Sequence, residues 1–488
     1  MVGKSRLAKR HVNPIYERRH MFISDTLPFV GKYIDEIDAA LKTYDENAKL
    51  TNSQKAWLGF CVMAIFVTRT FCWAKFERAC LGVRSSAALS WMFRRSAIPW
   101  QILLAASTVI VIRRFGIIRG RLVIDETDKK RSKSAKFIYN LHKIKDKASG
   151  GYINGQKLVF LYLVSDTVSI PVGFEFYKPD PELKKWKKND EKLRKQGVSK
   201  KNRPPEPPRN PSCPTVADIA LTLLRQFRLN HPCVKIDCIL ADALYGTRTF
   251  VDEASAIFGG VQVISQIRTN QNIRCRNREK TVEKYFSSYP GTRQKIGIRG
   301  GEKVTATVGS ARLHVCSHGK KRFVIALKYE GEEEYRFIIA ADLSWRTLDI
   351  VEAYTLRWLV EVFFEDWKIC EGWGRLTKQT GEKGSRRGVI ISLLVDHCLL
   401  FHPDQQAFID DKLAACTVGS LIRRIRTECF LQFVEDLISD ENRHQILDNL
   451  AKHLKNGIYE LMPSSKHMSG ITIGRLESTP SLKYKNAA

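Results

Sequence analysis

The order of apolar segments between residues 121 and 267 constrains the fold more than any other feature of this chain. Short runs rich in Val, Ile and Leu predict strands, and longer stretches with apolar residues three and four apart predict helices. In chain order they are strand 121–125, strand 157–166, strand 168–177, helix 215–229, strand 234–241, helix 248–258 and strand 261–267. The second and third strands meet at a turn near Thr167. This β-β-β-α-β-α-β order predicts a mixed sheet covered by helices, which is an α/β fold.

Helices are expected before this region. Residues 1–115 predict a helical N-terminal domain, and the segments 71–80 and 85–96 flank a break at Gly82. Two helices joined by a short glycine-containing turn have the spacing of a helix-turn-helix motif, which binds DNA through its second helix. An ordinary helical bundle also contains such pairs, so both interpretations stay open.

The second helix of this pair carries the predicted DNA contacts. In the helix-turn-helix interpretation, Arg94 and Arg95 face DNA. Leu89 and Trp91 are expected to pack inward against the rest of the N-terminal domain.

Two segments interrupt the α/β order. Residues 178–214 contain eight of the chain's 17 prolines and many lysines and arginines, which predicts a solvated or DNA-facing loop. Residues 268–342 predict a separate β-rich insertion domain. Its strands are expected at 302–308, 311–317, 321–329 and 334–342. The α/β core would then comprise 116–267 and 343–402, followed by a helical C-terminal region, 403–488, as a candidate for dimerisation.

The charge of the chain points to a polyanionic partner. The 80 lysines and arginines outnumber the 51 acidic residues, giving a formal net charge of +29 and a pI of about 9.7. Nucleic acid is the first candidate and an anionic membrane surface the second. The longest apolar runs, 56–67 and 102–112, are shorter than the roughly 20 residues that span a bilayer. The start of the chain does not resemble a secretion signal, and the 12 cysteines lack zinc-ligand spacing, so reduced thiols are expected.

Two aspartates follow predicted buried strands. Asp125 ends the run 121–125, and Asp242 ends the run 234–241. A carboxylate at the end of a buried strand is held rigidly beside a crevice, which suits a metal ligand. Each position, taken alone, also suits an ordinary turn or helix cap.

A third carboxylate belongs to the amphipathic segment 354–368. At about 100° per residue, Tyr354, Arg357, Glu361 and Lys368 share an arc of about 60° on one side of a helix. Apolar residues occupy the other side. Glu365 lies close to the same arc and remains the alternative to Glu361 as a ligand.

Three carboxylates from two strands and a helix suit divalent metal chemistry. Mg²⁺ prefers oxygen ligands, and two such ions can activate an attacking oxygen and stabilise the leaving 3′-oxygen of a DNA strand. Arg357 and Lys368, near Glu361, would bind DNA phosphates.

These residues resemble a known family. Tyr354-x2-Arg357-x3-Glu361-x6-Lys368 agrees in residue type and spacing with the Tyr-Arg-Glu-Lys motif of DDE transposases from cut-and-paste bacterial insertion sequences. Asp125-x-Thr127 and Asp242 resemble the first and second catalytic aspartates of that family. The resemblance covers about 121–400 and implies an RNase-H-like catalytic core with a β-strand insertion domain before the catalytic glutamate.

The resemblance also implies an activity. Asp125, Asp242 and Glu361 would hold two Mg²⁺ ions, with Mn²⁺ as a substitute, and Tyr354, Arg357 and Lys368 would contact DNA. A strand is hydrolysed at the element end, its 3′-OH forms a hairpin with the opposite strand, and the reopened end is joined to target DNA. A homodimer would pair the terminal inverted repeats in the bacterial cytoplasm, without a membrane partner.

One feature departs from hairpin-forming relatives, which use an aromatic ring, often Trp, in the inserted domain to stack on a flipped base. This chain has no Trp between residues 186 and 345. Trp345 is the candidate for this role, and the other rings are Tyr285, Tyr289, Tyr329 and Tyr335. Two alternatives to an active transposase remain: a non-catalytic DNA-binding relative, decayed or repurposed, and a related nuclease without strand transfer.

Overall fold

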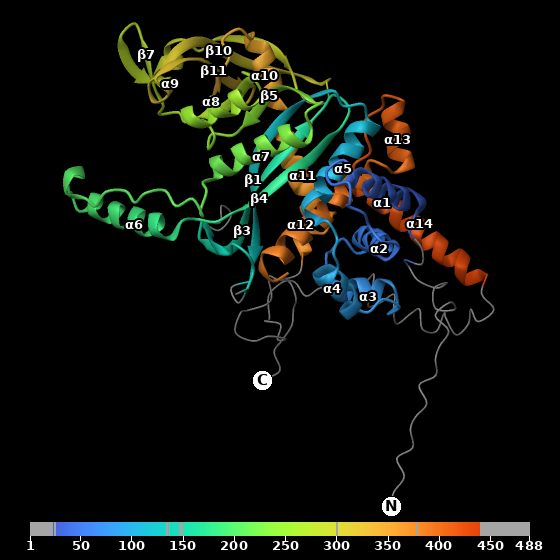
Figure 1. The fold of residues 1–488 in the computed structure, drawn as a ribbon. Coiled ribbons are helices and arrows are strands. Elements are labelled where there is room, and N and C mark those ends of the chain that lie inside the picture. The colour runs from blue at the N-terminus through green and yellow to red at the C-terminus, as the bar shows by residue number, and fades with distance from the viewer. Residues whose placement is uncertain are drawn as a thin grey trace, which may run out of the picture.

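A 12-stranded sheet runs through the part of the chain that the structure describes (Figure 1). The computed structural model describes residues 23, 26–132, 135, 137–145, 150–298, 301–376 and 379–439. The strand order is β2-β3-β1-β5-β6-β12-β11-β10-β7-β8, with β4 paired to β3 and β9 paired to β10. The strands are β1 (Arg119–Arg131), β2 (His142–Lys145), β3 (Tyr152–Val164), β4 (Ser169–Tyr177), β5 (Lys235–Ala241), β6 (Gln262–Ile267), β7 (Asn272–Cys275), β8 (Arg278–Thr281), β9 (Thr292–Gly297), β10 (Lys303–Val315), β11 (Lys320–Tyr329) and β12 (Arg336–Ala340).

The half of the sheet formed by β4, β3, β1, β5 and β6 has the predicted mixed character. β3 runs antiparallel to β1 and β4, whereas β1, β5 and β6 are parallel. Leu122, Val123 and Ile124 of β1 are all 0% exposed, so both faces of this strand are covered. The helices that cover this half of the sheet lie both between its strands in the sequence, as α7 (Val216–Asn230) does, and after them, as α11 (Trp358–Ile369) does, which confirms the mixed α/β class.

Alternate residues of β3 show which helix covers which face. Phe160 contacts Phe363 and Trp367 of α11 (Trp358–Ile369). The next residue, Leu161, lies on the other face, which α7 (Val216–Asn230) covers. Asp125 is the direct cross-strand partner of Phe160, so its side chain is on the α11 face.

A helical body packs beside the sheet (Figure 1). At its centre is α2, whose side chains are buried on all sides from Trp57 to Val67, and which starts with the predicted cap at Thr51. One of its neighbours is α12 (Gly381–Leu399), which packs on α5 (Trp100–Arg114), and both α5 and α12 contact β4. The remaining helices of the described residues are α1 (Pro28–Leu41), α2 (Asn52–Thr68), α3 (Trp73–Ala79), α4 (Ser86–Arg95), α5 (Trp100–Arg114), α6 (Pro181–Lys195), α8 (Arg248–Ile257), α9 (Val282–Ser288), α10 (Thr347–Thr355), α12 (Gly381–Leu399), α13 (Pro403–Asp410) and α14 (Val418–Ile438).

Within the described ranges, no helix is by itself long and apolar enough to cross a bilayer, although α4 and α5, bent by 93° at their junction, reach that length together. The predicted helices of the C-terminal region begin as α13 and α14. The rest of that region, residues 440–488, with its candidate role in dimerisation, lies outside the described residues, as do residues 1–22.

The β-rich insertion differs from the expected separate sheet. β12 pairs with β6, so the insertion continues the sheet of the core. The two strands expected at 302–308 and 311–317 are one strand, β10. Gly309 does not turn the chain, because it stays in register opposite Ala326 and leaves room for the ring of Phe286.

The segment 178–214 is not a loop throughout, because residues Pro181–Lys195 form helix α6. The helix starts at a good capping site: Asp180 accepts hydrogen bonds from the backbone N–H groups of Glu182 and Leu183. The prediction that this segment stays outside the core is confirmed for α6, which buries none of its residues.

The proposed helix-turn-helix segment consists of α3 and α4, and Gly82 between them has a φ of +85°. Leu89 is buried, as predicted, but Trp91 is 58% exposed, so its expected inward packing is wrong. The buried face of α4 is set by Leu89 and Phe93, four residues apart. Trp91, two residues from each, therefore projects from the other side of the helix.

Candidate active site

Asp125 lies in the middle of β1, and its residue is 8% exposed. One carboxylate oxygen, Oδ1, accepts a hydrogen bond of 2.8 Å from the backbone N–H of Glu126. Burial raises the pKa of Asp125 to about 7, although the positive charge of Arg357 acts in the opposite direction. A raised pKa means that the surroundings of the buried carboxylate do not fully stabilise its negative charge. A bound cation would supply that stabilisation.

Asp242 is the first residue after β5, as predicted. Its Oδ1 accepts a hydrogen bond of 2.8 Å from the backbone N–H of Leu244, which fixes the turn. Because Ile124 and Ala241 are register partners of the parallel strands β1 and β5, the residues that follow them, Asp125 and Asp242, are neighbours. The structure thus brings together two aspartates that are far apart in the sequence.

Glu126 is a third acidic residue here that the sequence reasoning did not select. Asp125, Glu126 and Asp242 each offer a ligand oxygen, and these oxygens lie within 4.8 Å of one another. Alternation along β1 places Glu126 on the other face of the sheet from Asp125. The pairing of β1 with β5 ends at Ala241, so β5 no longer lies beside β1 at Asp125 and Glu126. Asp242 can therefore approach both of these side chains, although they lie on opposite faces of the sheet.

Partners already hold the Glu126 carboxylate. Tyr245 donates its hydroxyl to Oε2 at 3.2 Å, and the Lys157 ammonium lies 3.7 Å from Oε1. Burial raises the pKa of Glu126, opposed by Lys157. The signal that could have found this residue is Tyr245, a tyrosine three residues after Asp242, which is 0% exposed and needs a polar partner for its hydroxyl.

The segment 354–368 is not one continuous helix, which corrects the prediction. Helix α10 ends at Thr355 and α11 begins at Trp358. Between them, the backbone N–H groups of Leu356 and Arg357 bond to carbonyls three residues earlier, which is a tightened turn. The sequence contains no Gly or Pro in this turn from which the break could have been predicted. The break interrupts the single helix on which the four polar residues were expected to share one face.

Arg357 at this break joins two of the predicted ligands. Its Nη1 donates to Asp125 Oδ2 at 2.9 Å, and its Nη2 donates to Glu361 Oε1 at 2.8 Å. The planar guanidinium, with its fixed fork of N–H donors, is suited to hold two carboxylates at once. Glu361 is thereby held beside Asp125, while Glu365 is exposed and makes no hydrogen bond or ion pair with another described residue.

Tyr354 and Lys368 have different environments. Tyr354 is 8% exposed, its hydroxyl donates to Gln266 Oε1 at 3.4 Å, and burial raises its pKa to about 12. Lys368 is partly buried, which lowers its pKa, and its Nζ lies 5.7 Å from the centre of the Phe364 ring. The structure leaves the DNA contacts of both residues as predictions.

The far end of β1 anchors the chain just after α11. Lys129 donates to the backbone carbonyls of Trp373 and Gly374, and Arg131 Nη1 donates to the carbonyl of Leu376 at 2.9 Å. Burial lowers the pKa of Lys129 to about 7. These bonds tie the end of α11 to the strand that carries Asp125, which helps to fix Glu361 relative to that aspartate.

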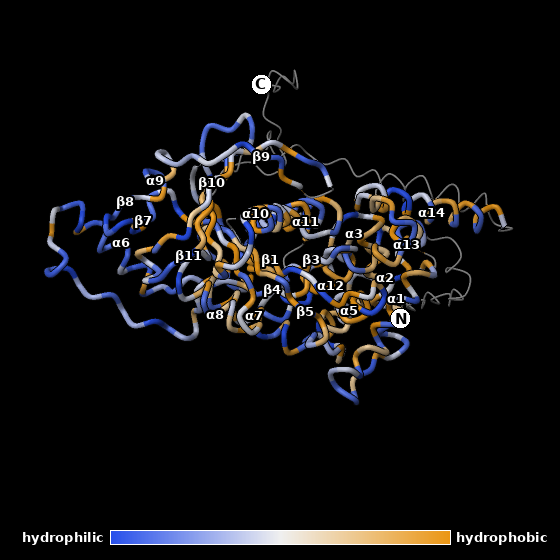
Figure 2. Tube along the Cα trace, turned by 90° about the horizontal axis from the view of Figure 1, so that it is seen from above, coloured by the Kyte–Doolittle hydropathy of each residue, from blue (hydrophilic) through white to orange (hydrophobic). Residues whose placement is uncertain are grey.

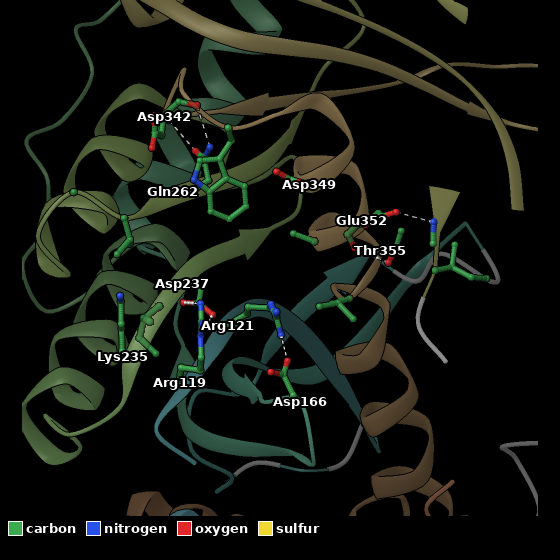
Figure 3. Close-up of a pocket in the computed structure, with 18 residues that line it drawn as sticks. Arg119, Arg121, Asp166, Lys235, Asp237, Gln262, Asp342, Asp349, Glu352 and Thr355 are labelled. Atoms are coloured by element: carbon green, nitrogen blue, oxygen red, sulfur yellow. Dashed lines mark hydrogen bonds and ion pairs between the residues drawn. The ribbon is translucent and has the colours of Figure 1, made fainter. Parts of the chain in front are cut away.

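The structure does not bring Trp345 to the carboxylates. It lines a pocket of about 720 Å³ with Arg119, Arg121 and Asp237 (Figure 3). Arg119 and Lys235 begin β1 and β5, so the pocket is at the amino-terminal edge of the parallel strands, whereas Asp242 is at the opposite edge. A base flipped at the carboxylates would need a different ring from the one that the sequence favoured.

Arg94 and Arg95 lie in the last turn of α4 and are both exposed. The Nε of Arg94 donates to the carbonyl of Ser90 at 3.3 Å, and Arg387 of α12 donates to the carbonyl of Arg94 at 3.0 Å. The helix is therefore fixed to the helical body with both guanidinium groups on its surface. Their contact with DNA remains a prediction.

A second group of potential ligands among the described residues is already balanced by a cation. His402, Asp404 and Glu428 lie within ligand distance of one another. Arg424 Nε is 3.4 Å from Asp404 and 3.1 Å from Glu428, and His402 Nδ1 accepts from the backbone N–H of Asp404. The Asp125 group also faces cations, Arg357 and Lys157, but its Asp242 has no ion pair with another described residue.

A buried acidic pair lies behind the site. Glu371 follows α11, is 0% exposed, and neither carboxylate oxygen has a donor among the described residues. Burial, together with the charge of Asp396 on α12, raises the pKa of Glu371 well above its ordinary value. Burial and the charge of Asp366 raise the pKa of Asp396 to about 8.

This pair predicts a pH-dependent stability. A carboxyl whose folded-state pKa is raised contributes stability below its unfolded pKa near 4, and that stability is lost as the pH rises through about 8. We expect Glu371→Gln to raise the free energy of unfolding at pH values above 8 by about 1–3 kcal/mol, because it removes a buried charge. Urea denaturation at acidic and alkaline pH measures this difference. Equal stabilisation at both pH values would contradict it.

A protein-family model matches part of this sequence. The model of the DDE superfamily endonuclease matches residues 82–308, a region that holds Asp125 and Asp242 and ends before Glu361. The comparison with curated proteins found no match.

Two solved structures are distantly similar. A cryo-EM structure of the piggyBac transposase synaptic complex with hairpin DNA aligns over 95% of this chain and 89% of that chain, with 11% identity and a TM-score of 0.39. The NurA nuclease from Sulfolobus solfataricus aligns over 49% of this chain and 72% of that chain, with 8% identity and a TM-score of 0.23. Both TM-scores are too low to support an inference. Residues 82–308, with two of the three predicted catalytic carboxylates, are thus similar to the DDE superfamily endonucleases.

Proposed function

We propose that the protein is a DDE transposase that moves a bacterial insertion sequence by a cut-and-paste mechanism. The observation that carries this proposal is the fork of Arg357, which joins Asp125 to Glu361 although Asp125 and Arg357 are 232 residues apart in the sequence. With Asp242 beside Asp125, and with Glu361 linked to Asp125 through Arg357, the three carboxylates of the motif would form one site. The similarity of residues 82–308 to DDE superfamily endonucleases supports the same chemistry.

The strand order adds support for the expected core. β4-β3-β1-β5-β6, with only β3 reversed, agrees with the RNase-H-like arrangement that the resemblance implies. The first aspartate is on the central strand and the second follows the adjacent parallel strand. Carboxylates at these places meet at one edge of the sheet.

The residues fit divalent metal ions. Asp125, Asp242 and Glu361 would hold two Mg²⁺ ions, with Mn²⁺ as a substitute, and Glu126 offers a further oxygen. When bound, such ions activate the attacking oxygen and stabilise the leaving 3′-oxygen. Burial raises the pKa of both Asp125 and Glu126 despite the nearby Arg357 and Lys157, and a bound cation would stabilise these buried carboxylates.

The chain's own residues orient the reactants. Arg357 fixes the positions of Asp125 and Glu361 before DNA binds. Lys368 and Tyr354 would contact phosphates near the cleaved end. Each step exchanges one P–O bond for another. Water releases a 3′-OH, the 3′-OH attacks the opposite strand to close a hairpin, water then hydrolyses the hairpin to free the 3′-OH again, and this 3′-OH attacks target DNA. A homodimer would hold the two terminal inverted repeats together.

A cleavage and joining assay tests this function. Purified protein is incubated with labelled DNA that carries the ends of its own element and with a target plasmid, in Mg²⁺ or in EDTA. We expect Mg²⁺-dependent nicks at the element boundary, then a hairpin-sized product, then joined products on denaturing gels. Cleavage without joining would favour a related nuclease. Binding without cleavage in either Mg²⁺ or Mn²⁺ would favour a non-catalytic DNA-binding relative.

Lys368 gives a separate prediction for DNA binding. Replacing it by Gln removes one phosphate contact, so the slope of log affinity against log salt concentration should become shallower by about 0.9. Fluorescence anisotropy with an end duplex at several KCl concentrations measures this slope. An unchanged slope would show that Lys368 does not bind phosphate.

A further inference from the structure

An arm of the chain, residues 178–214, leaves the sheet after β4 and returns at α7. Figure 1 shows its helix α6 projecting away from both the sheet and the helical body. Figure 2 shows the arm as largely hydrophilic, and in both figures it projects toward the same side of the molecule as β7 and α9 of the insertion. The arm contains 12 lysines and arginines and five acidic residues.

The arm has a defined tertiary structure, because one side of α6 packs against the segment that leads back to the sheet. The indole N–H of Trp186 donates to the carbonyl of Pro204 at 2.9 Å. Asp190 pairs with Arg203 at 2.8 Å, with the two side chains 26% and 15% exposed. Leu183 and Leu193 lie on the same side of the helix at about 100° per residue. The apolar side of α6 is thus used within the arm.

The other side of α6 presents a row of lysines. At about 100° per residue, five lysines fall within an arc of about 100°. They are Lys184, Lys185, Lys188, Lys192 and Lys195, and all five are exposed. Within the part of the chain that the structure describes, only Lys195 has an acidic partner, Glu191 at 3.0 Å. We call this row the lysine face of the arm.

The arm starts near the candidate active site. Tyr177, the last residue of β4, is in register with Lys157 of β3, which in turn is in register with Asp128 of β1. Asp128 is three residues beyond Asp125 on the same strand. DNA that reaches the carboxylates would therefore pass close to Tyr177, after which the arm begins.

We propose that the lysine face binds the phosphate backbone of duplex DNA that flanks the cleaved end. This proposal rests on the proposed function. Helix α6, with 15 residues, is about 22 Å long, and duplex DNA of that length carries about 13 phosphate charges. A row of five exposed lysines, four of them without an acidic partner among the described residues, matches such a regular polyanion. An anionic membrane fits less well, because a membrane-binding helix inserts its apolar face, and in α6 that face already contacts the return chain.

The test replaces Lys184, Lys188 and Lys192 by Gln and measures binding to an end duplex with a long flank between 50 and 200 mM KCl. Three lost phosphate contacts reduce the salt slope by about 2.7, so over this range the wild-type protein should lose about 40-fold more affinity than the variant. The matched control replaces Lys42, Lys49 and Lys412, which are exposed and far from α6 in the sequence, by Gln. The control should keep the wild-type slope.

Shortening the flank and measuring cleavage distinguish the outcomes. On a duplex whose flank is too short to reach the arm, the arm variant and the wild type should bind equally. At saturating protein both should cleave with Mg²⁺, because the lysine face lies outside the carboxylate site. Suppose that the wild type binds and cleaves, but the salt slope of the arm variant equals that of the wild type or falls by no more than that of the control. This result would overturn the role of the arm and leave the proposed function standing. A wild type that binds no DNA overturns both proposals.

Discussion

Replacing Asp242 by Asn is expected to reduce DNA cleavage by about 10³-fold or more while DNA affinity stays within about twofold. The loss follows from the proposed mechanism, in which Asp242 and Asp125 hold the metal ions and metal-assisted stabilisation of the transition state is worth several kcal/mol. Affinity is expected to persist because phosphate contacts elsewhere carry most of it. Single-turnover cleavage and anisotropy binding with the same labelled duplex measure the two effects.

A matched control separates this effect from a general change in charge. Asp166 lies at the opposite edge of the parallel strands, where it pairs with Arg121 at 2.8 Å and is 73% exposed. Asp166→Asn changes the net charge by the same amount and should leave the cleavage rate unchanged. Robust Mg²⁺-dependent cleavage by Asp242→Asn would show that the carboxylate pair is not the catalytic site.

The second large effect is expected at Glu361. Glu361→Gln should reduce cleavage by about 10³-fold or more, because it removes the third metal ligand and its ion pair with Arg357. Glu365→Gln should cleave within about twofold of the wild type, because Glu365 is exposed one turn further along α11. The same single-turnover assay on both variants decides between the two glutamates that the sequence left open.

The opposite result has a definite meaning. If Glu361→Gln cleaves normally and Glu365→Gln does not, the Arg357 fork marks a structural ion pair, and the third ligand is Glu365. Thermal denaturation of both variants checks that each remains folded.

The parts of the fold that neighbouring residues determine, such as individual strands, were predictable from the sequence. Continuous apolar residues predict the buried strands 121–125 and 234–241, and Asp242 follows the second of them as expected. The first strand continues through charged residues to Arg131, so Asp125 lies within β1 and not at its end. The pairing of β12 with β6 was not predictable, because strand partners far apart in the sequence leave no local signal. The break expected between the strands 302–308 and 311–317 is absent, because Gly309 stays within β10 and packs closely against Phe286, a contact that local sequence does not reveal.

The candidate site was predictable in its residues but less so in its geometry. Regular helical spacing predicts one continuous helix with Tyr354 on the same face as Glu361, yet the chain makes a tightened turn before Trp358, and Tyr354 is buried. The role of Arg357 as a link between carboxylates depends on a contact across 232 residues of sequence. Glu126 was passed over because strand alternation excludes it from the Asp125 face, and only the end of β5 at Ala241 lets both residues approach Asp242.

Anomalous diffraction from crystals grown with Mn²⁺ tests the central claim most directly, that Asp125, Asp242 and Glu361 form one metal-binding centre. The expected result is anomalous density within about 2.0–2.6 Å of the Asp125 and Asp242 oxygens, with Glu361 on the same ions or one water away, and its loss in Asp242→Asn. Density confined to the His402 group, or none beside Asp125 at saturating Mn²⁺, would contradict the claim.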